Sequence, residues 1–190
     1  MRWLIGLIFA LTFFGQASAQ NHSSRAEAIF AGGCFWCVES DFEHVDGVLE
    51  AISGYTGGAL QNPTYENHEG HVEAVRVIYD PGRVSYAQLL HHFWRHHDPL
   101  DSGGQFCDRG ASYRAAIFVT PEQRSIAERS LADTRRILGR PIATPILPAT
   151  RFWPAETYHQ GYYQRNPVQY RFYRWRCGRD QRVEEVWRSH

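Results

Sequence analysis

Apolar and polar positions repeat along most of the chain with the periods of short strands and amphipathic helices. From residue 26 onward, apolar runs of strand length alternate with longer stretches in which apolar residues recur every three or four positions. The pattern predicts strands over 26–31, 48–55, 71–79 and 113–119, and helices over 34–44, 85–96 and 120–138. This order of elements predicts an α+β fold, a two-layer sandwich in which helices pack on a mixed sheet.

Capping residues and prolines set the boundaries of several elements. Ser85 with Gln88, and Thr120 with Gln123, have the spacing of capping boxes, which begin helices. The prolines between 141 and 148 are typical of an edge strand, because proline cannot donate a ladder hydrogen bond. No Gly-rich loop has the strand-to-helix context of a phosphate site, which argues against a doubly wound nucleotide fold.

The first 19 residues have the composition of a secretory signal peptide. Arg2 precedes an apolar run over 3–14, and small residues follow, with a cleavage site after Ala19. The run is too short for a comfortable membrane span, although a retained anchor stays open as the alternative. The sequence therefore predicts a signal peptide over 1–19 and one catalytic domain over 20–190. We expect a periplasmic or secreted protein with no stable membrane insertion after signal removal.

The composition of the mature chain argues against nucleic acid binding and is consistent with a single domain. The 20 basic side chains match 20 acidic ones, and the leader carries only one of these charges, so the mature charge is close to zero. Nucleic acid binding has no electrostatic basis in such a chain. Aromatic residues make up 14% of the sequence, enough large side chains for the core of one domain. They crowd residues 152–175, which we expect to form an aromatic C-terminal tail that wraps the body of a monomer.

The stretch Gly33-Cys34-Phe35-Trp36-Cys37 places a thiol at the predicted junction of a strand and a helix. Backbone amides and the positive end of the helix dipole favour a thiolate there, so we expect a lowered pKa for Cys34. Cys37 lies nearly one helical turn away, close enough for a disulfide. The alternative interpretation of the four cysteines in an exported chain is a structural disulfide or two small core residues.

Glu73 is a second candidate for chemistry, because it lies in the apolar strand predicted over 71–79. Burial disfavours a carboxylate and raises its pKa, so Glu73 can act as a neutral acid. The alternative is an ion pair with Arg76 or Arg114.

Six short motifs follow one another in order from about Ala28 to Asn166. They are Gly33-Cys34-Phe35-Trp36, Gly54-Tyr55-Thr56-Gly57-Gly58, Asn62-Pro63-Thr64-Tyr65, Gly70-His71-Val72-Glu73-Ala74-Val75, His97-Asp98-Pro99, and Asp108-Arg109-Gly110 with Tyr113-Arg114. Together they resemble the peptide methionine sulfoxide reductase A family. The resemblance implies reduction of the S epimer of methionine sulfoxide, free or in proteins, as a repair reaction without a metal or bound organic cofactor. It also implies an external dithiol such as a thioredoxin-like protein.

By position, the resemblance assigns a role to each member of the motifs. It implies the nucleophile Cys34, the acid Glu73, the hydroxyl donors Tyr65 and Tyr113, a supporting Asp108, and a cage for the substrate methyl group made of Phe35 and Trp36. Thiolate attack on a sulfoxide needs a proton delivered to the oxygen, which is a poor leaving group. Attack leaves Cys34 as a sulfenic acid, which a second thiol converts to a disulfide.

Three cysteines are candidates for that second, resolving thiol. Cys37 completes a CxxC pair with Cys34, and Cys177 lies in the tail, where family members often place recycling cysteines. Cys107 precedes Asp108 in a loop. We rank Cys37 and Cys177 equally and Cys107 third.

Two other classes of protein remain as alternatives. A thioredoxin-like disulfide exchanger also has a CxxC at the start of a helix, but it has no use for Glu73 and two tyrosines as proton donors. A metal-binding module is suggested by His92 and His96, which share one face of a predicted helix, with His91 and His97 beside them. No cysteine or carboxylate completes a convincing ligand set there, so we expect no metal site.

Overall fold

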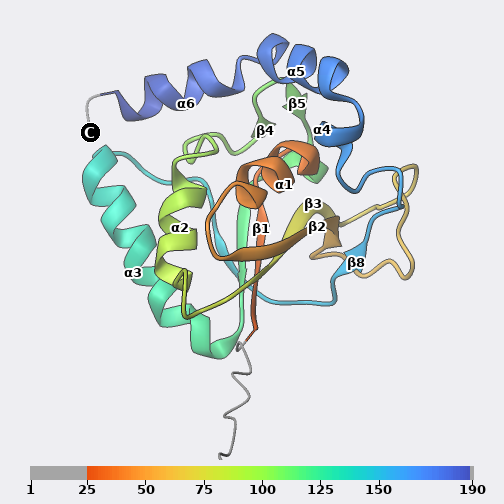
Figure 1. Cartoon of the computed structure of the whole chain (residues 1–190). Coiled ribbons are helices and arrows are strands. Elements are labelled where there is room, and N and C mark those ends of the chain that lie inside the picture. Colours follow the sequence, from red (N-terminus) through yellow and green to blue (C-terminus); the bar gives the residue numbers. More distant parts are fainter. Residues whose placement is uncertain (1–24, 189–190) are drawn as a thin grey trace, which may run out of the picture.

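The computed structural model describes residues 25–188, which form a mixed sheet covered on one face by helices (Figure 1). The six strands lie in the order β7-β6-β1-β3-β2-β8. Strands β6 and β7 run parallel, and the other neighbouring pairs are antiparallel. The strands are β1 (Ala26–Ala31), β2 (Val48–Thr56), β3 (Val72–Tyr79), β6 (Ala116–Val119), β7 (Ile146–Pro148) and β8 (Trp153–Pro154). The predicted signal peptide lies outside the described residues.

Helices cover one face of this sheet and one of its ends. Helix α1 (Phe35–Glu43) packs on β2 and β3, and α3 (Pro121–Leu138) packs on β6 beside α2 (Tyr86–Trp94). Three further helices run along the end of the sheet where α1 begins: α4 (Tyr162–Arg165), α5 (Pro167–Arg176) and α6 (Arg179–Trp187) (Figure 1). Among the residues described, no helix is long and apolar enough to cross a membrane.

The alternation of side chains along β1 explains the two layers. Phe30 points to the helices, where its ring centroid lies 4.8 Å from that of Phe42 in α1 and 5.0 Å from that of Phe93 in α2. Ala31 points to the opposite face, into a smaller cluster with Phe118. This period of two is the geometry of a strand buried on both faces. The predicted α+β sandwich with a mixed sheet is confirmed.

Local signals in the sequence set most helix ends. Both predicted capping boxes are present, Ser85 with Gln88 at the start of α2 and Thr120 with Gln123 at the start of α3. The prolines between 141 and 148 lead into the edge strand β7, as predicted.

The strand predicted over 113–119 is wrong at its start. Tyr113 ends a short 3-10 helix, η1 (Ala111–Tyr113), and β6 begins only at Ala116. The reason lies in the neighbouring strand: Ala116 pairs with Ala31, the last residue of β1. Upstream of Ala116 the chain pairs with no strand of this sheet, so it turns and brings Tyr113 to the cavity at the start of α1.

The predicted aromatic tail is helical over much of its length. The side of these helices that faces the domain contains charged side chains, because Arg174 is half-buried and Arg179 is buried. Cys177 caps the C-terminal end of α5.

Candidate active site

All seven side chains assigned roles in substrate chemistry lie around one cavity of about 60 Å³ at the N-terminal end of α1. An eighth residue, Tyr173 of α5, also lines the cavity and was not predicted. The lining residues are Cys34, Phe35, Trp36, Tyr65, Glu73, Asp108, Tyr113 and Tyr173. Segments far apart in the sequence therefore meet at the predicted nucleophile.

The turn that presents Cys34 depends on Gly33. Its φ of +85° is in the left-handed region, and a Cβ added there would lie 2.5 Å from the Cβ of Gln105. Both facts exclude a larger side chain without strain. Gln105 is itself fixed, because its side chain bonds the backbone N–H and C=O of Asp98 at 2.8 and 2.9 Å. Cys34 then occupies the N-cap position of α1.

The expected lowering of the Cys34 pKa is wrong for this resting structure. Burial raises the pKa of the Cys34 thiol, and interaction with the Cys37 thiol raises it further. The side chain is only 6% exposed, so loss of water around the sulfur outweighs the amides of the helix end. The hydroxyl of Tyr173 acts in the opposite direction and lowers the pKa of Cys34.

Cys37 is the ionisable partner in this pair. Its pKa is lowered, first by a hydrogen bond with Cys34 and then, against the effect of burial, by the charges of Arg179 and Arg174. Cys34 is thus the donor and Cys37 the acceptor of the hydrogen bond within this pair.

Glu73 faces α1 from strand β3, and its carboxyl oxygen Oε2 accepts a hydrogen bond of 2.9 Å from the backbone N–H of Phe35. Burial raises the pKa of Glu73 to about 8, so the group is mostly protonated at neutral pH. No ion pair among residues 25–188 includes Glu73, in contrast to the alternative of a pair with Arg76 or Arg114. The guanidinium of Arg76 instead lies over the ring of Phe152.

We expect Glu73→Gln to stabilise the fold increasingly as pH rises from 4.5 to 8. A carboxyl with a raised folded-state pKa keeps its proton while the unfolded chain loses it, so wild-type stability falls with pH across this window. Glutamine does not titrate, and the difference between the two proteins should grow by on the order of a few kcal/mol. Urea unfolding at pH 5 and pH 8 measures it. An unchanged difference would contradict a neutral Glu73.

Three tyrosine hydroxyls face the cavity. Burial raises the pKa of Tyr65 and of Tyr113, so both phenols stay protonated and can donate. Tyr173 donates a short hydrogen bond to Oδ2 of Asp108. Because Tyr173 also interacts with Cys34, it joins the predicted supporting carboxylate to the nucleophile.

A layer of side chains behind the cavity fixes the aromatic wall. The indole N–H of Trp36 donates to Nδ1 of His159 at 3.1 Å, and its ring stacks on Tyr162 with centroids 3.8 Å apart. The carboxylate of Glu156 accepts from the backbone N–H of Tyr65. These residues after position 155 were not predicted, because the local sequence shows no periodic pattern that separates them from other polar and aromatic residues.

Cys107 and Cys177 form a disulfide across 70 residues of sequence, and Cys34 and Cys37 are free thiols. The interpretation as a structural disulfide therefore applies to one pair at most. The CxxC pair is present as a dithiol beside the cavity.

The histidines considered for a metal bond to the protein itself. A ring nitrogen of His92 lies 2.9 Å from the carbonyl oxygen of Asp41, and one of His96 lies 2.7 Å from that of His92. His97 is fixed by Phe93 and Thr144 through its two ring nitrogens. These side chains hold α2 against its neighbours.

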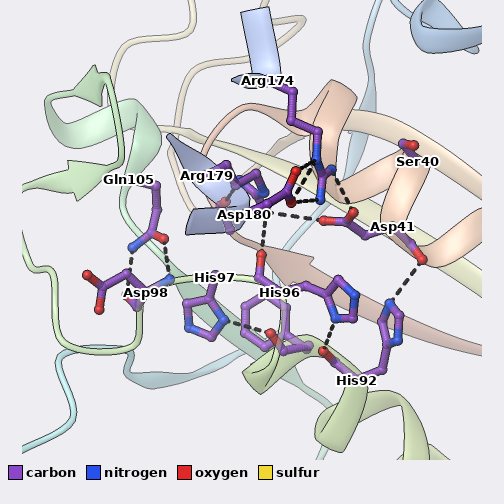
Figure 2. A network of polar contacts seen from close by, with 12 residues as sticks. Ser40, Asp41, His92, His96, His97, Asp98, Gln105, Arg174, Arg179 and Asp180 are labelled. Carbon is purple, nitrogen blue, oxygen red and sulfur yellow. Dashed lines mark hydrogen bonds and ion pairs between the residues drawn. The ribbon is translucent and has the colours of Figure 1, made fainter. Parts of the chain in front are cut away.

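A polar network ties the C-terminal helices to α1 (Figure 2). The carboxylate of Asp41 pairs with Arg174 at 2.7 Å and with Arg179 at 3.4 Å. Arg179 also donates to the carbonyl of Gly32, directly before the turn that carries Cys34. The same two arginines lower the pKa of Cys37, so the network both holds the turn that carries the dithiol and favours ionisation of Cys37.

Comparison with known proteins agrees with this geometry. The model of the family described as peptide methionine sulfoxide reductase matches residues 26–190. The chain belongs to the peptide methionine sulfoxide reductase family. It is 51% identical over 194 residues to peptide methionine sulfoxide reductase MsrA 2 of Caulobacter vibrioides, covering 98% of this chain and 99% of that protein. It is 55% identical over 165 residues to MsrA 2 of Rhizobium meliloti, covering 84% and 82% of the two chains.

A solved structure shares the fold of this reductase. The crystal structure of Mxr1 from Saccharomyces cerevisiae in reduced form aligns with a TM-score of 0.71 and 27% identity, covering 77% of this chain and 88% of that one. The predicted family is confirmed by the sequence matches and the predicted fold by this structural match.

Proposed function

We propose that this reductase converts methionine-S-sulfoxide, free or in proteins, to methionine through Cys34 with Glu73 as the acid. The enzyme is a methionine sulfoxide reductase by family, and the proposal concerns the residues that perform the reaction. One observation supports it most strongly: a carboxyl with a pKa of about 8 lies with the thiol of Cys34 in one small cavity.

The chemistry follows from this arrangement. As the sulfur of Cys34 attacks the sulfoxide sulfur, it loses its proton to solvent, and the proton of Glu73 passes to the sulfoxide oxygen. Glu73 then regains a proton from solvent. Tyr65 and Tyr113 donate hydrogen bonds to that oxygen, and Phe35 and Trp36 exclude water around the substrate methyl group. The net change is transfer of the oxygen atom to Cys34, which becomes a sulfenic acid, and release of the thioether.

Cys37 is the resolving thiol in this proposal. It is free, buried and in contact with Cys34, whereas Cys107 and Cys177 are bonded to each other. Attack of Cys37 on the sulfenic sulfur forms the Cys34–Cys37 disulfide and releases water. An external dithiol of the thioredoxin class then supplies the electrons that restore both thiols, without a metal or bound organic cofactor in the protein.

Cys37→Ser should reduce thioredoxin-supported turnover by at least about tenfold, because the sulfenic acid loses its nearby partner. The first methionine per chain should still be released. Methionine counted in the absence and presence of reductant measures both effects. The double variant Cys107→Ser with Cys177→Ser is the control, since it should still form the Cys34–Cys37 bond. Full turnover in Cys37→Ser, or a disulfide from Cys34 to Cys177 in pre-reduced wild type, would contradict Cys37 as the resolving thiol and assign that role to another thiol.

A stereochemically resolved assay tests the proposed reaction as a whole. Purified protein with dithiothreitol should consume the S epimer of a methionine sulfoxide peptide and leave the R epimer. Rapid reduction of insulin disulfides with no sulfoxide turnover would instead favour the thioredoxin-like alternative.

We also propose that the protein is exported as a monomer after cleavage behind Ala19. The composition of residues 1–19 supports the export and the cleavage site. N-terminal sequencing of protein from a periplasmic fraction should begin at Gln20, and a start at Met1 in a membrane fraction would indicate a retained anchor.

A further inference from the structure

Helix α5 exposes three large apolar side chains on one side. Val168, Phe172 and Trp175 have exposed fractions of 67%, 56% and 75%. Their spacing of four and three residues places them on one face of the helix, and the rings of Phe172 and Trp175 lie 6.0 Å apart. We call these three residues the α5 stripe. Large exposed apolar groups that lie together are characteristic of an interaction surface.

The other side of α5 already has its partners. Tyr170 is buried, and Arg174 pairs with Asp41 of α1. The helix is therefore held firmly against the domain, and the α5 stripe is left facing outward on a rigid element.

The α5 stripe leads directly to the disulfide. Helix α5 ends at Arg176, Cys177 is its C-cap, and the disulfide to Cys107 follows at once. Cys107 is exposed, whereas the side chains of Cys34 and Cys37 are only 6% and 2% exposed. A protein thiol can therefore approach Cys107, while the buried pair is closed to a partner of that size.

The charged residues of helix α5 itself are all basic, and the acidic Asp180 beside Trp175 is paired with Arg174. Helix α5 contains no acidic residue, and Arg171 and Arg176 are exposed without an ion pair among the residues described. This combination of apolar and positive groups suits a partner whose reactive thiol is surrounded by an apolar surface with acidic residues at its edge.

We propose that the α5 stripe is the docking surface for the dithiol protein that reduces the enzyme, with Cys107 as the sulfur it attacks. The inference rests on the proposed function, because each turnover leaves a disulfide that an external dithiol must reduce. Small thiols do not need an aromatic surface, so the stripe points to a protein reductant.

The exchange proceeds in two balanced steps. A thiolate of the reductant attacks Sγ of Cys107, the bond to Cys177 breaks, and Cys177 leaves as a thiolate that takes up a proton. The second thiol of the reductant then attacks the mixed disulfide, releases Cys107 as a thiol and leaves the reductant oxidised. The reduced pair Cys107 and Cys177 can then reduce a Cys34–Cys37 disulfide by the same thiol–disulfide exchange. Tyr173 and Asp108 lie between the two pairs.

The rate at which a purified bacterial thioredoxin reduces the Cys107–Cys177 disulfide tests this docking surface without any sulfoxide. Reduced thioredoxin is mixed with the oxidised full-length protein, and alkylation with mass spectrometry follows the new thiols. The double variant Phe172→Ser with Trp175→Ser should lower the second-order rate constant by about tenfold or more, since exposed aromatic anchors dominate such contacts. Reduction by dithiothreitol should stay within about twofold of wild type.

The matched control is the double variant Leu49→Ser with Ile137→Ser. These side chains are 44% and 41% exposed on β2 and α3, away from the disulfide, and their loss should leave the thioredoxin rate unchanged. An unchanged rate in the α5 variant overturns the proposal, as does an equal loss with dithiothreitol. Thioredoxin lacking its second cysteine should be trapped on Cys107, and an adduct on any other cysteine also contradicts it.

A membrane surface is the competing occupant of an apolar and basic helix. Sedimentation with anionic phosphatidylglycerol vesicles measures it in the same proteins. Vesicle binding that the α5 variant loses, with an unchanged thioredoxin rate, would assign the stripe to lipid and overturn the proposal. Because none of these measurements uses sulfoxide, failure of the docking surface and failure of the proposed function are seen separately.

Discussion

Cys34→Ser should lower methionine release by at least about 10⁴-fold, with no release in a single round. The sulfur of Cys34 is the atom that bonds to the substrate sulfur, and a serine hydroxyl at this buried position cannot replace a thiol as nucleophile. The measurement is methionine released per chain after one addition of a sulfoxide peptide.

Two controls separate chemistry from folding in this experiment. The free energy of unfolding of Cys34→Ser should remain close to that of wild type, because serine is similar in size and Cys37 is the only thiol whose contact it changes. Cys37→Ser should retain the first round of release. Methionine release by Cys34→Ser at a rate near wild type would reject the assignment of the nucleophile.

Glu73→Ala should slow the first round of release by about 10²–10⁴-fold, the usual contribution of a general acid. Glu73→Gln should fall between this variant and wild type, since its amide can donate a hydrogen bond to the oxygen but cannot transfer a proton. Wild-type activity should decline as pH rises through about 8, where Glu73 loses its proton, and both variants should lack this decline.

Glu39 provides a matched control for this prediction. Burial raises its pKa to about 7, but its carboxylate accepts hydrogen bonds from Ser53 and Gly161 outside the cavity. Glu39→Gln should therefore keep the first-round rate within a few fold. An equal loss in the Glu39 and Glu73 variants would show that burial of a carboxyl in this core, rather than proton transfer, explains the effect.

The strands and the capped helices could be predicted because their signals are local. The capping boxes of Ser85 and Thr120 and the alternation along Ala26–Ala31 are complete within a few residues. The apolar run that follows Tyr113, from Ala115 to Val119, predicts a strand, whereas the end of β1 at Ala31 decides where pairing begins. That information is not present in the segment itself.

The C-terminal helices depend on contacts that no local pattern shows. Arg174 and Arg179 hold α5 and α6 to Asp41, some 133 and 138 residues away in sequence. Because buried arginines are rare, the sequence alone predicts that such arginines lie on the solvent-exposed surface. Tyr173 could not be predicted for the same reason, because it lines the cavity from α5, which is far in sequence from the other residues of the site.

The motifs predict which residues form the site, but they do not predict the pKa shift of every one of those residues. The burial of Glu73 was predictable from the apolar residues beside it in β3. For Cys34, the helix end predicted a lower pKa, and the desolvation that raises it depends on how tightly Tyr173 and the aromatic wall close the cavity. Pairing of Cys107 with Cys177 was equally hidden, since four cysteines allow three connectivities.

Capture of the oxidised sulfur tests the central chemical claim most directly. Cys37→Ser protein is given one equivalent of methionine-S-sulfoxide peptide in the presence of dimedone, which reacts with sulfenic acids, and the adduct is located by mass spectrometry. We predict one adduct per chain on Cys34, formed with the S epimer and absent with the R epimer. Methionine release without an adduct on Cys34, or an adduct on another cysteine, would contradict the account.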